Sequence, residues 1–235
     1  MSLQLFEREH HRRIATILES LDPACLAASA CYFGGGTAMA LRYGEYRESV
    51  DIDFLVSDVR GYRQLRQQLT QAEGLQAIAR PGHEWAQVRE MRADQYGIRT
   101  MLRVDHTDIK FEIVLEARMV LETPGAADHI CGVATLTALD MATSKLLANS
   151  DRWRDDAVLS RDLIDLAMMA PAKPLLRQAI QKAAAAYGDS VQADLAKAIQ
   201  NLRERPHRLD HCMQAMRLTA LSKAMLWTRI KALKP

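Results

Sequence analysis

The sequence predicts an α/β (α+β) protein, with an N-terminal α/β domain at residues 1–123 and a C-terminal helical domain at 124–235. Short alternating runs rich in β-branched residues, separated by glycine and polar turns, are concentrated in the N-terminal half. From about residue 135 onward, apolar residues recur at helical spacing instead. The change falls near Thr123-Pro124-Gly125, a turn-forming triplet that marks the predicted boundary.

The N-terminal domain is predicted to begin with a helix at 5–21, because its apolar residues follow helical spacing. The next predicted elements are a short strand and turn at 31–35, a helix at 37–44 that Gly44 ends, and a strand at 50–56. After these we expect a helix at 60–74 and strands at 75–79, 85–91, 98–104 and 108–116.

The last two of these strands should form a hairpin, because the polar residues 105–107 separate two alternating runs. The C-terminal domain is predicted to contain helices at 137–150, 160–170, 174–188 and 190–204, and a last helix that runs to Leu233.

Composition indicates a soluble globular chain: 49% of its 235 residues are apolar and 26% are charged. The formal net charge of +2 gives no global electrostatic reason to expect nucleic acid, so any basic surface must be local. The four cysteines form no C-x-x-C pair, which fits reduced thiols in a cytosolic protein. No stretch reaches the roughly 18 apolar residues of a membrane span, and we expect a cytoplasmic location.

Two aspartates lie close together in the predicted strand at 50–56. Residues two apart in a strand point to the same face with Cα atoms roughly 6.5 Å apart, so Asp51 and Asp53 share a face. Carboxylates that approach to about 4 Å repel by roughly 1 to 4 kcal/mol, and a divalent cation removes that repulsion. Mg²⁺ is usually held by one or two carboxylates together with substrate phosphates. For a D-x-D pair alone, an exposed strand face is the alternative interpretation.

Three glycines and a threonine, Gly34-Gly35-Gly36-Thr37, precede that strand and open the predicted helix at 37–44. Glycines let backbone N–H groups approach phosphates, and a helix N-terminus with an adjacent hydroxyl suits anions. A tight connection between strand and helix also requires glycine, so the turn alone has a purely structural explanation. A phosphate-binding turn followed by a metal-binding pair is a more specific signal of function than either feature alone.

The two features together resemble the active-site signature of the DNA polymerase β-like nucleotidyltransferase superfamily. In the fuller form Gly35-Gly36-Thr37 followed by Arg47-Glu48-Ser49-Val50-Asp51-Ile52-Asp53-Phe54, the sequence is similar to the AbiEii/AbiGii toxin family, which carries R-x-S-x-D-x-D at this point. The resemblance implies a nucleotidyltransferase domain with a small mixed sheet, followed by the helical domain.

The resemblance also implies roles for individual residues. The residues expected to hold a nucleoside triphosphate are Gly35, Gly36, Thr37, Arg47 and Ser49. Asp51 and Asp53 are expected to bind Mg²⁺, with two ions possible in the clamp that such enzymes use for nucleotidyl displacement.

A third carboxylate is expected from a neighbouring strand. Strand alternation places Asp108, Lys110 and Glu112 on one face of the predicted strand at 108–116. Glu112 is the candidate, either as a metal ligand or as general base for the attacking hydroxyl. An exposed hairpin face is the alternative, and Lys110 could instead neutralise phosphate.

A second pattern lies in the predicted helical domain. The sequence K-L-L-A, starting at Lys145, followed by R-D-L-I-D-L at 161–166, resembles the downstream motifs of the same toxin family. The resemblance implies that Lys145 contacts the triphosphate, and that Asp162 or Asp165 positions Lys145 or the acceptor. Without the resemblance, a surface lysine and a solvated acidic helix face would be the ordinary interpretation.

These features lead to the hypothesis of a Mg²⁺-dependent nucleotidyltransferase that transfers a nucleoside monophosphate from a triphosphate to an acceptor hydroxyl. The resemblance adds the 3′ end of tRNA as a possible acceptor and a cognate antitoxin protein as a possible partner. The rival hypotheses are a nucleotidyltransferase that modifies a small molecule such as an antibiotic, and a catalytically silent nucleotide-binding or interaction module. An acidic pocket would favour the small-molecule enzyme, and a basic groove beside Asp51 would favour RNA.

Overall fold

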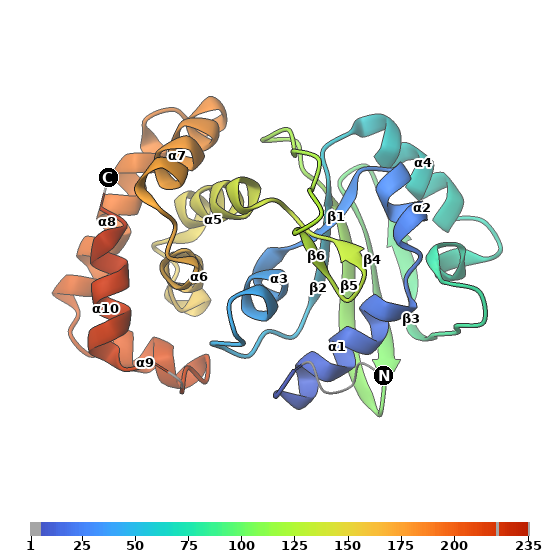
Figure 1. Ribbon diagram of the computed structural model, residues 1–235, viewed down its shortest axis with the longest axis horizontal. Helices are drawn as coiled ribbons and strands as arrows, with labels where there is room; N and C mark the ends of the chain where they lie inside the picture. The colour runs from blue at the N-terminus through green and yellow to red at the C-terminus, as the bar shows by residue number, and fades with distance from the viewer. Residues whose placement is uncertain (1–5, 220, 235) are drawn as a thin grey trace. The chain divides into compact units, whose positions relative to one another are not determined.

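The computed structural model describes residues 6–219 and 221–234, and its main sheet has five strands (Figure 1). The strands are β1 (Cys31–Gly34), β2 (Ile52–Val56), β3 (Ala86–Ala93), β4 (Gly97–Val104) and β5 (Thr107–Leu115). They are arranged in the order β1-β2-β5-β4-β3. Only β2 and β5 run parallel, and the other neighbouring pairs are antiparallel. The expected α/β (α+β) class with a small mixed sheet is confirmed.

The hairpin predicted at 98–116 is present as β4 and β5. Their cross-strand partners run from Gly97 opposite Val114 to Val104 opposite Thr107. The strand predicted at 75–79 is wrong, because this segment forms the 3₁₀ helix η1 (Gly74–Ile78). Its buried residues, Leu75 and Ile78, are three apart, which matches the 3₁₀ repeat better than strand alternation.

Four helices accompany the strands: α1 (Glu9–Ser20), α2 (Pro23–Ala28), α3 (Gly35–Arg42) and α4 (Val59–Leu69). Leu5, at the start of the helix predicted at 5–21, lies outside the described residues, and the helix begins at Glu9. Asp22 and Asp58 cap α2 and α4, because their carboxylates accept hydrogen bonds from first-turn N–H groups.

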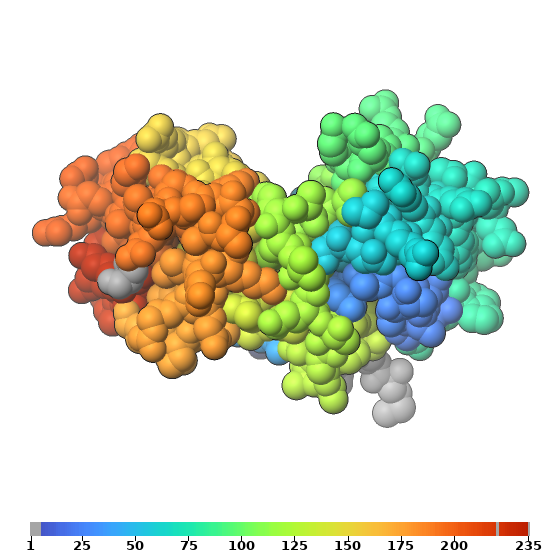
Figure 2. Space-filling view, turned by 90° about the horizontal axis from the view of Figure 1, so that it is seen from above, coloured from blue at the N-terminus to red at the C-terminus, as the bar shows by residue number. Residues whose placement is uncertain are grey.

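One face of the sheet forms the core of this region. Its side chains from β4 and β5 are fully buried, namely Ile98, Leu102, Ile109, Phe111 and Ile113. α4 packs against β2, and the start of α4 also lies close to the end of α2. A Cβ on Gly61 would be 2.5 Å from the carbonyl oxygen of Ser29, and α2 (blue) and α4 (cyan) adjoin on the surface (Figure 2).

The chain divides into two compact units, which we call the sheet unit (6–42 and 49–137) and the helical unit (43–48 and 138–234, without 220). Residues 124–137 belong to the sheet unit, because the N–H of Leu136 donates to the carbonyl of Phe33. This segment also contains the short pair β6 (His129–Ile130) and β7 (Val133–Ala134), of which β7 packs against β1. The functional domain division at 123/124 stays a prediction.

The helical unit is built around α5, which packs against α6, α7 and α8. The helices are α5 (Ala138–Arg152), α6 (Arg161–Met169), α7 (Lys173–Tyr187), α8 (Ser190–Glu204), α9 (Arg208–Ala215) and α10 (Lys223–Ala232), with a short 3₁₀ turn η2 (Asp156–Val158). Instead of one last helix, α9 and α10 are separate. Arg217 has a φ of 54° after α9, and the Ser222 hydroxyl caps α10.

Among the described residues, the structure contains no helix that is both long and apolar enough to cross a membrane.

Candidate active site

The centre of the candidate site is a row of residues that crosses the sheet. Asp53 on β2 is in register with Gly34 on β1 and with Glu112 on β5. Cross-strand partners point to the same face of a sheet, so the Asp53 and Glu112 carboxylates lie side by side on the face opposite the core. Neighbouring strands are about 4.8 Å apart, which is close enough for both carboxylates to share a cation or a phosphate-bound water.

Asp51 lies immediately before β2 and is partly exposed, as is Asp53. Both aspartates influence the charge state of Lys110 on β5. Burial alone lowers the pKa of Lys110, but its hydrogen bond to Glu112 and the charges of Asp53 and Asp51 raise it above its ordinary value. Of the three carboxylates, Glu112 is in direct contact with Lys110, and the charges of Asp51 and Asp53 act on Lys110 as well.

Gly35 has a backbone conformation and surroundings that only glycine suits. Its φ is +67°, in the left-handed region, and a Cβ there would lie 2.4 Å from Oδ2 of Asp53. The carboxylate of Asp53 therefore lies directly against the backbone turn that begins α3. The predicted phosphate-binding turn and the predicted metal ligand are in contact.

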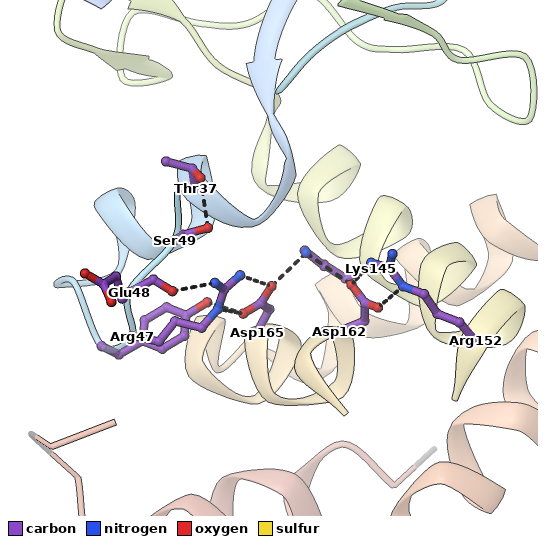
Figure 3. A network of polar contacts seen from close by, with 9 residues as sticks. Thr37, Arg47, Glu48, Ser49, Lys145, Arg152, Asp162 and Asp165 are labelled. Atoms are coloured by element: carbon purple, nitrogen blue, oxygen red, sulfur yellow. Dashed lines mark hydrogen bonds and ion pairs between the residues drawn. The ribbon is translucent and has the colours of Figure 1, made fainter. Parts of the chain in front are cut away.

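The Thr37 hydroxyl joins the start of α3 to the segment that leads into β2. It is 2.8 Å from the Ser49 hydroxyl (Figure 3), and it donates to the carbonyl oxygen of Asp51. Thr37 is only 1% exposed, so these contacts occupy its hydroxyl in the interior. In this structure Thr37 and Ser49 fix the backbone beside Asp51, and their predicted contacts with a triphosphate stay a prediction.

Two histidines of α1 also contact the segment before β2, and nothing in their sequence context predicts these contacts. The Nε2 atom of the fully buried His11 accepts a hydrogen bond from the N–H of Ser49, 3.2 Å away. Nε2 of His10 is 3.0 Å from the carbonyl oxygen of Val50. A histidine pair in an amphipathic helix carries no sequence signal for such a role, because the contact joins residues far apart in the chain.

Glu112 is held by two cations. Arg99 Nε donates to Oε1 of Glu112, and Lys110 Nζ lies 2.5 Å from Oε2. Burial raises the pKa of the Glu112 carboxyl, but the hydrogen bonds from Lys110 and Arg99 outweigh this and leave its pKa below the ordinary value. Glu112 is therefore ionised at neutral pH, as a metal ligand must be. Its role as ligand or base stays a prediction.

In the helical unit, the predicted Lys145 and the aspartates of α6 form one buried network with Arg47 (Figure 3). Arg47 donates from Nε to Oδ1 of Asp165 at 2.7 Å and from Nη2 to Oδ2 at 2.9 Å. Nζ of Lys145 lies 2.7 Å from Oδ2 of Asp165, and the Tyr46 hydroxyl donates to Oδ1 at 2.7 Å. Asp165 is fully buried, so these donors supply the partners that a buried carboxylate requires.

Asp162 forms the second half of the network. It accepts from Lys145 at 3.2 Å, and from Nε and Nη2 of Arg152 at 2.7 and 3.0 Å. Burial alone raises the pKa values of Asp162 and Asp165, but the adjacent cations lower both below the ordinary value. Lys145 thus bridges both aspartates named from the sequence. The roles of Lys145, Asp162 and Arg47 in nucleotide binding or catalysis stay predictions.

The carboxylates beside the α3 turn fit a magnesium ion by their chemistry. Across the described parts of the chain, no group of three or more His, Cys, Asp or Glu side chains is arranged to hold a metal by itself. Mg²⁺ needs fewer protein ligands than that, because it keeps several waters and takes further oxygens from substrate phosphates. Asp51 and Asp53 supply the one or two carboxylates that such a site uses.

A mixed sheet with a glycine turn, a following helix and acidic residues on the next strand defines the nucleotidyltransferase class of proteins. Two solved structures from Helicobacter pylori are similar to the chain across nearly all of its length. The first, provisionally assigned as a nucleotidyltransferase, has a TM-score of 0.52 and 18% identity, and the match covers 96% of this chain and 93% of that one. The second, JHP933, has a TM-score of 0.50 and 17% identity, with coverage of 97% and 93%. At these identities the likeness shows the fold.

The family follows from the sequence match. Residues 16–231 match the family described as Nucleotidyl transferase AbiEii toxin, Type IV TA system. Because the match spans most of the chain, the protein belongs to this family of nucleotidyltransferase enzymes, as the resemblance of its motifs implied. No curated protein matches the chain.

Proposed function

We propose that the protein transfers a nucleoside monophosphate from a nucleoside triphosphate to an acceptor hydroxyl in a Mg²⁺-dependent reaction. The observation that carries this proposal is the register of Asp53 between the glycine turn and Glu112, with the turn in contact with the Asp53 carboxylate. Backbone donors for phosphate and carboxylates for a cation therefore lie next to each other, as nucleotidyl transfer requires.

In the proposed reaction, the acceptor oxygen forms a bond to the α-phosphorus, and the bond from that phosphorus to the bridging oxygen breaks, releasing pyrophosphate. The acceptor's O–H bond breaks, and its proton passes to a base or to water. Mg²⁺, when bound, neutralises charge on the phosphate oxygens and on the departing pyrophosphate. Asp51 and Asp53 hold the cation, and the turn at Gly35 and Gly36 receives phosphate.

The hydroxyl contacts of Thr37 support this reaction indirectly. They tie the N-terminal turn of α3 to the backbone at Ser49 and Asp51, so the phosphate-binding and metal-binding groups keep a fixed separation. Such preorganisation matters because small displacements of positioned groups greatly reduce transfer rates.

For the acceptor, we propose RNA, with the 3′ end of tRNA as the acceptor that the family resemblance suggests. Membership of a toxin family of the Type IV toxin-antitoxin class supports a cognate antitoxin as a partner. The basic side chains beside Glu112, Arg99 and Lys110, favour an anionic acceptor over a cationic antibiotic.

Nucleotide binding tests the metal site. Titration of each nucleoside triphosphate into the wild-type protein should show binding that requires Mg²⁺, and the variants Asp51→Asn and Asp53→Asn should lose that requirement together with most of the affinity. Asp108→Asn, which removes a carboxylate from the same sheet face at a position ion-paired with Arg103, serves as the control. Unchanged Mg²⁺-dependent binding in both aspartate variants would contradict the assignment.

A further inference from the structure

The face of the sheet opposite the core carries five basic side chains on β3, β4 and β5, which we call the arginine face. They come from three neighbouring strands and are Arg89, Arg92, Arg99, Arg103 and Lys110. Strand alternation on β4 and β5 places Arg99, Arg103 and Lys110 opposite the buried residues of the core, such as Ile98, Leu102 and Ile109, and the pairing of β3 with β4 places Arg89 and Arg92 on the same side. The same face carries Asp53 and Glu112.

The register connects the arginine face to the candidate active site. Arg92 on β3 pairs with Arg99 on β4, Arg99 pairs with Glu112 on β5, and Glu112 pairs with Asp53 on β2. Three steps between neighbouring strands separate Asp53 from Arg92, which corresponds to roughly 14 Å along the row. The basic residues therefore extend outward from the carboxylates to the edge of the sheet.

An irregularity in β3 increases the number of arginines on this face. Arg89 pairs with Met101 and Arg92 with Arg99, so three steps along β3 correspond to two along β4. In a regular strand, residues three apart point to opposite faces. The register shift instead turns both arginines to the same side, as bulges commonly do beside functional sites.

The side chains of the arginine face are accessible. Arg89, Arg92 and Arg103 are exposed, and the side chains of Arg99 and Lys110 are 41% and 42% exposed. On β3 and β4 the paired positions of this face are Ala86, Arg89, Arg92, Arg99, Met101 and Arg103, none of which is acidic. The acidic residues of this face, Asp53, Asp108 and Glu112, lie on β2 and β5, so its positive charge is concentrated on β3 and β4.

Some of these cations already have acidic partners and others do not. Arg103 forms a two-contact ion pair with Asp108, and Arg99 and Lys110 contact Glu112. Within the described residues, the guanidinium groups of Arg89 and Arg92 make no hydrogen bond or ion pair; the charge of Arg89 acts at longer range on Asp108, whose pKa lies below its ordinary value mainly because of its hydrogen bond with Arg103. No hydrogen bond or ion pair within the described residues therefore accounts for the two arginines on the exposed edge strand β3.

We propose that the arginine face binds the phosphodiester backbone of a single RNA strand and leads its terminal hydroxyl toward Asp51 and Asp53. The proposal rests on the proposed function, since it gives the location at which the RNA acceptor of that reaction binds. Arginine suits this role because its planar guanidinium binds phosphate oxygens through two parallel hydrogen bonds. The row of cations that ends at the carboxylates gives the strand both charge complementarity and a direction.

The test is RNA binding without nucleotide or Mg²⁺. Fluorescence anisotropy of a short, fluorescein-labelled single-stranded RNA is measured against the wild-type protein and the double variant Arg89→Gln/Arg92→Gln over a series of salt concentrations. Each phosphate contact contributes about 0.7 to the slope of log affinity against log salt, so the double variant should lower the slope by about 1.4. Its affinity at about 0.1 M salt should fall roughly 20-fold.

A matched control carries the same change of charge elsewhere in the sheet unit. Arg60 and Arg63 are exposed residues of α4, which packs against β2. Arg60→Gln/Arg63→Gln should bind RNA like the wild type, and circular dichroism should show that both double variants fold. Equal loss of binding in both double variants, or an unchanged salt slope in Arg89→Gln/Arg92→Gln, would overturn the proposal.

Two further comparisons separate this proposal from its rivals. Polyglutamate, a polyanion without phosphate, should compete poorly with the RNA; stronger binding of polyglutamate than of RNA would assign the face to an acidic protein instead. Because RNA binding is measured without nucleotide, it can succeed even if the Mg²⁺-dependent nucleotide binding of the proposed function fails. In the reverse result, Arg89→Gln/Arg92→Gln would bind both nucleotide and RNA like the wild type. That result would reject the RNA-binding role of the arginine face and leave the proposed function standing.

Discussion

Gly35 and Asp53 lie so close that a methyl group on the glycine would lie 2.4 Å from the Asp53 carboxylate oxygen Oδ2. This contact joins the two halves of the sequence signature, which are separated by the whole of α3 and the following loop. The same glycine has a φ of +67°, so its replacement changes both the backbone and the position of the aspartate.

We therefore expect Gly35→Ala to impair the site more than the fold. Holding alanine in a left-handed conformation costs about 1 to 2 kcal/mol of folding free energy, which urea unfolding measures. The displaced Asp53 should reduce nucleotidyl transfer by roughly 100-fold or more, since misplacement of about 1 Å can cost that much. Gly74→Ala is the control, because Gly74 has a φ of +56° but nothing within 4 Å of the added Cβ. An equal loss of activity in both variants would contradict the steric explanation.

The Thr37 hydroxyl provides a second test, because it is buried and bonded to the segment before β2. Thr37→Val keeps the shape but leaves the Asp51 carbonyl and the Ser49 hydroxyl without this partner, which should cost about 1 to 3 kcal/mol of stability. It should also weaken Mg²⁺-dependent nucleotide binding, as calorimetric titration would show. Thr37→Ser retains the hydroxyl and should preserve both properties; if Val and Ser behave alike, the hydroxyl has no such role.

Glu112 can act as a metal ligand or as a proton acceptor, and the register with Asp53 favours the ligand. We expect Glu112→Gln to raise the Mg²⁺ concentration needed for half-maximal nucleotide binding by roughly 10- to 100-fold, the range seen when groups around a metal are changed. Asp108→Asn on the same strand should leave it unchanged. A fall in turnover in Glu112→Gln, with the same Mg²⁺ requirement, would assign Glu112 to proton transfer.

The buried network of the helical unit should make stability depend on acid pH. Burial alone raises the pKa of the Asp165 carboxyl, but the charges of Arg47 and Lys145 lower it below its ordinary value, so the folded chain binds protons less readily than the unfolded chain. The stabilisation is therefore complete above about pH 4 and is lost as the pH falls below that. Asp165→Asn, which leaves buried cations without a charge partner, should destabilise the protein by about 3 to 5 kcal/mol at pH 7.

Denaturant unfolding from pH 7 to pH 3 measures this effect. The difference between wild type and Asp165→Asn should shrink as the pH falls, and a difference that stays constant would rule out the ion pair as its cause. Asp156→Asn is the control, because Asp156 pairs with Arg205 while both side chains are about half exposed. It should change stability by less than about 1 kcal/mol.

The local motifs were predictable because each depends on residues close together in the chain. The alternation of Asp51 with Ile52 and Asp53 with Phe54 placed the aspartates opposite the core, and Ile52 and Phe54 are indeed fully buried. The hairpin of β4 and β5 was predictable for the same reason. The segment at 75–79 was not, since a short apolar run fits a strand or a 3₁₀ turn and only its neighbours decide between them.

Contacts between distant segments were beyond the sequence. No pattern links His11 to Ser49, or Gly35 to Asp53, until the strands are in register and α1 is packed. Arg47 illustrates the difficulty. Its place in the motif predicts a phosphate ligand, and nothing in the sequence indicates that its guanidinium is also hydrogen-bonded to Asp165, more than a hundred residues later. The register shift that turns Arg89 and Arg92 to one face likewise depends on the pairing of β3 with β4.

The most direct measurement is transfer of label from each radiolabelled nucleoside triphosphate to total RNA in the presence of Mg²⁺. The wild-type protein should label an RNA fraction with at least one of the nucleotides and release pyrophosphate. Asp51→Asn and Asp53→Asn should reduce that labelling by roughly 100- to 1,000-fold while remaining folded, since each removes a preorganised charge from the reacting centre. Labelling that persists at the wild-type level in both variants would contradict the assignment of the active site to these two aspartates.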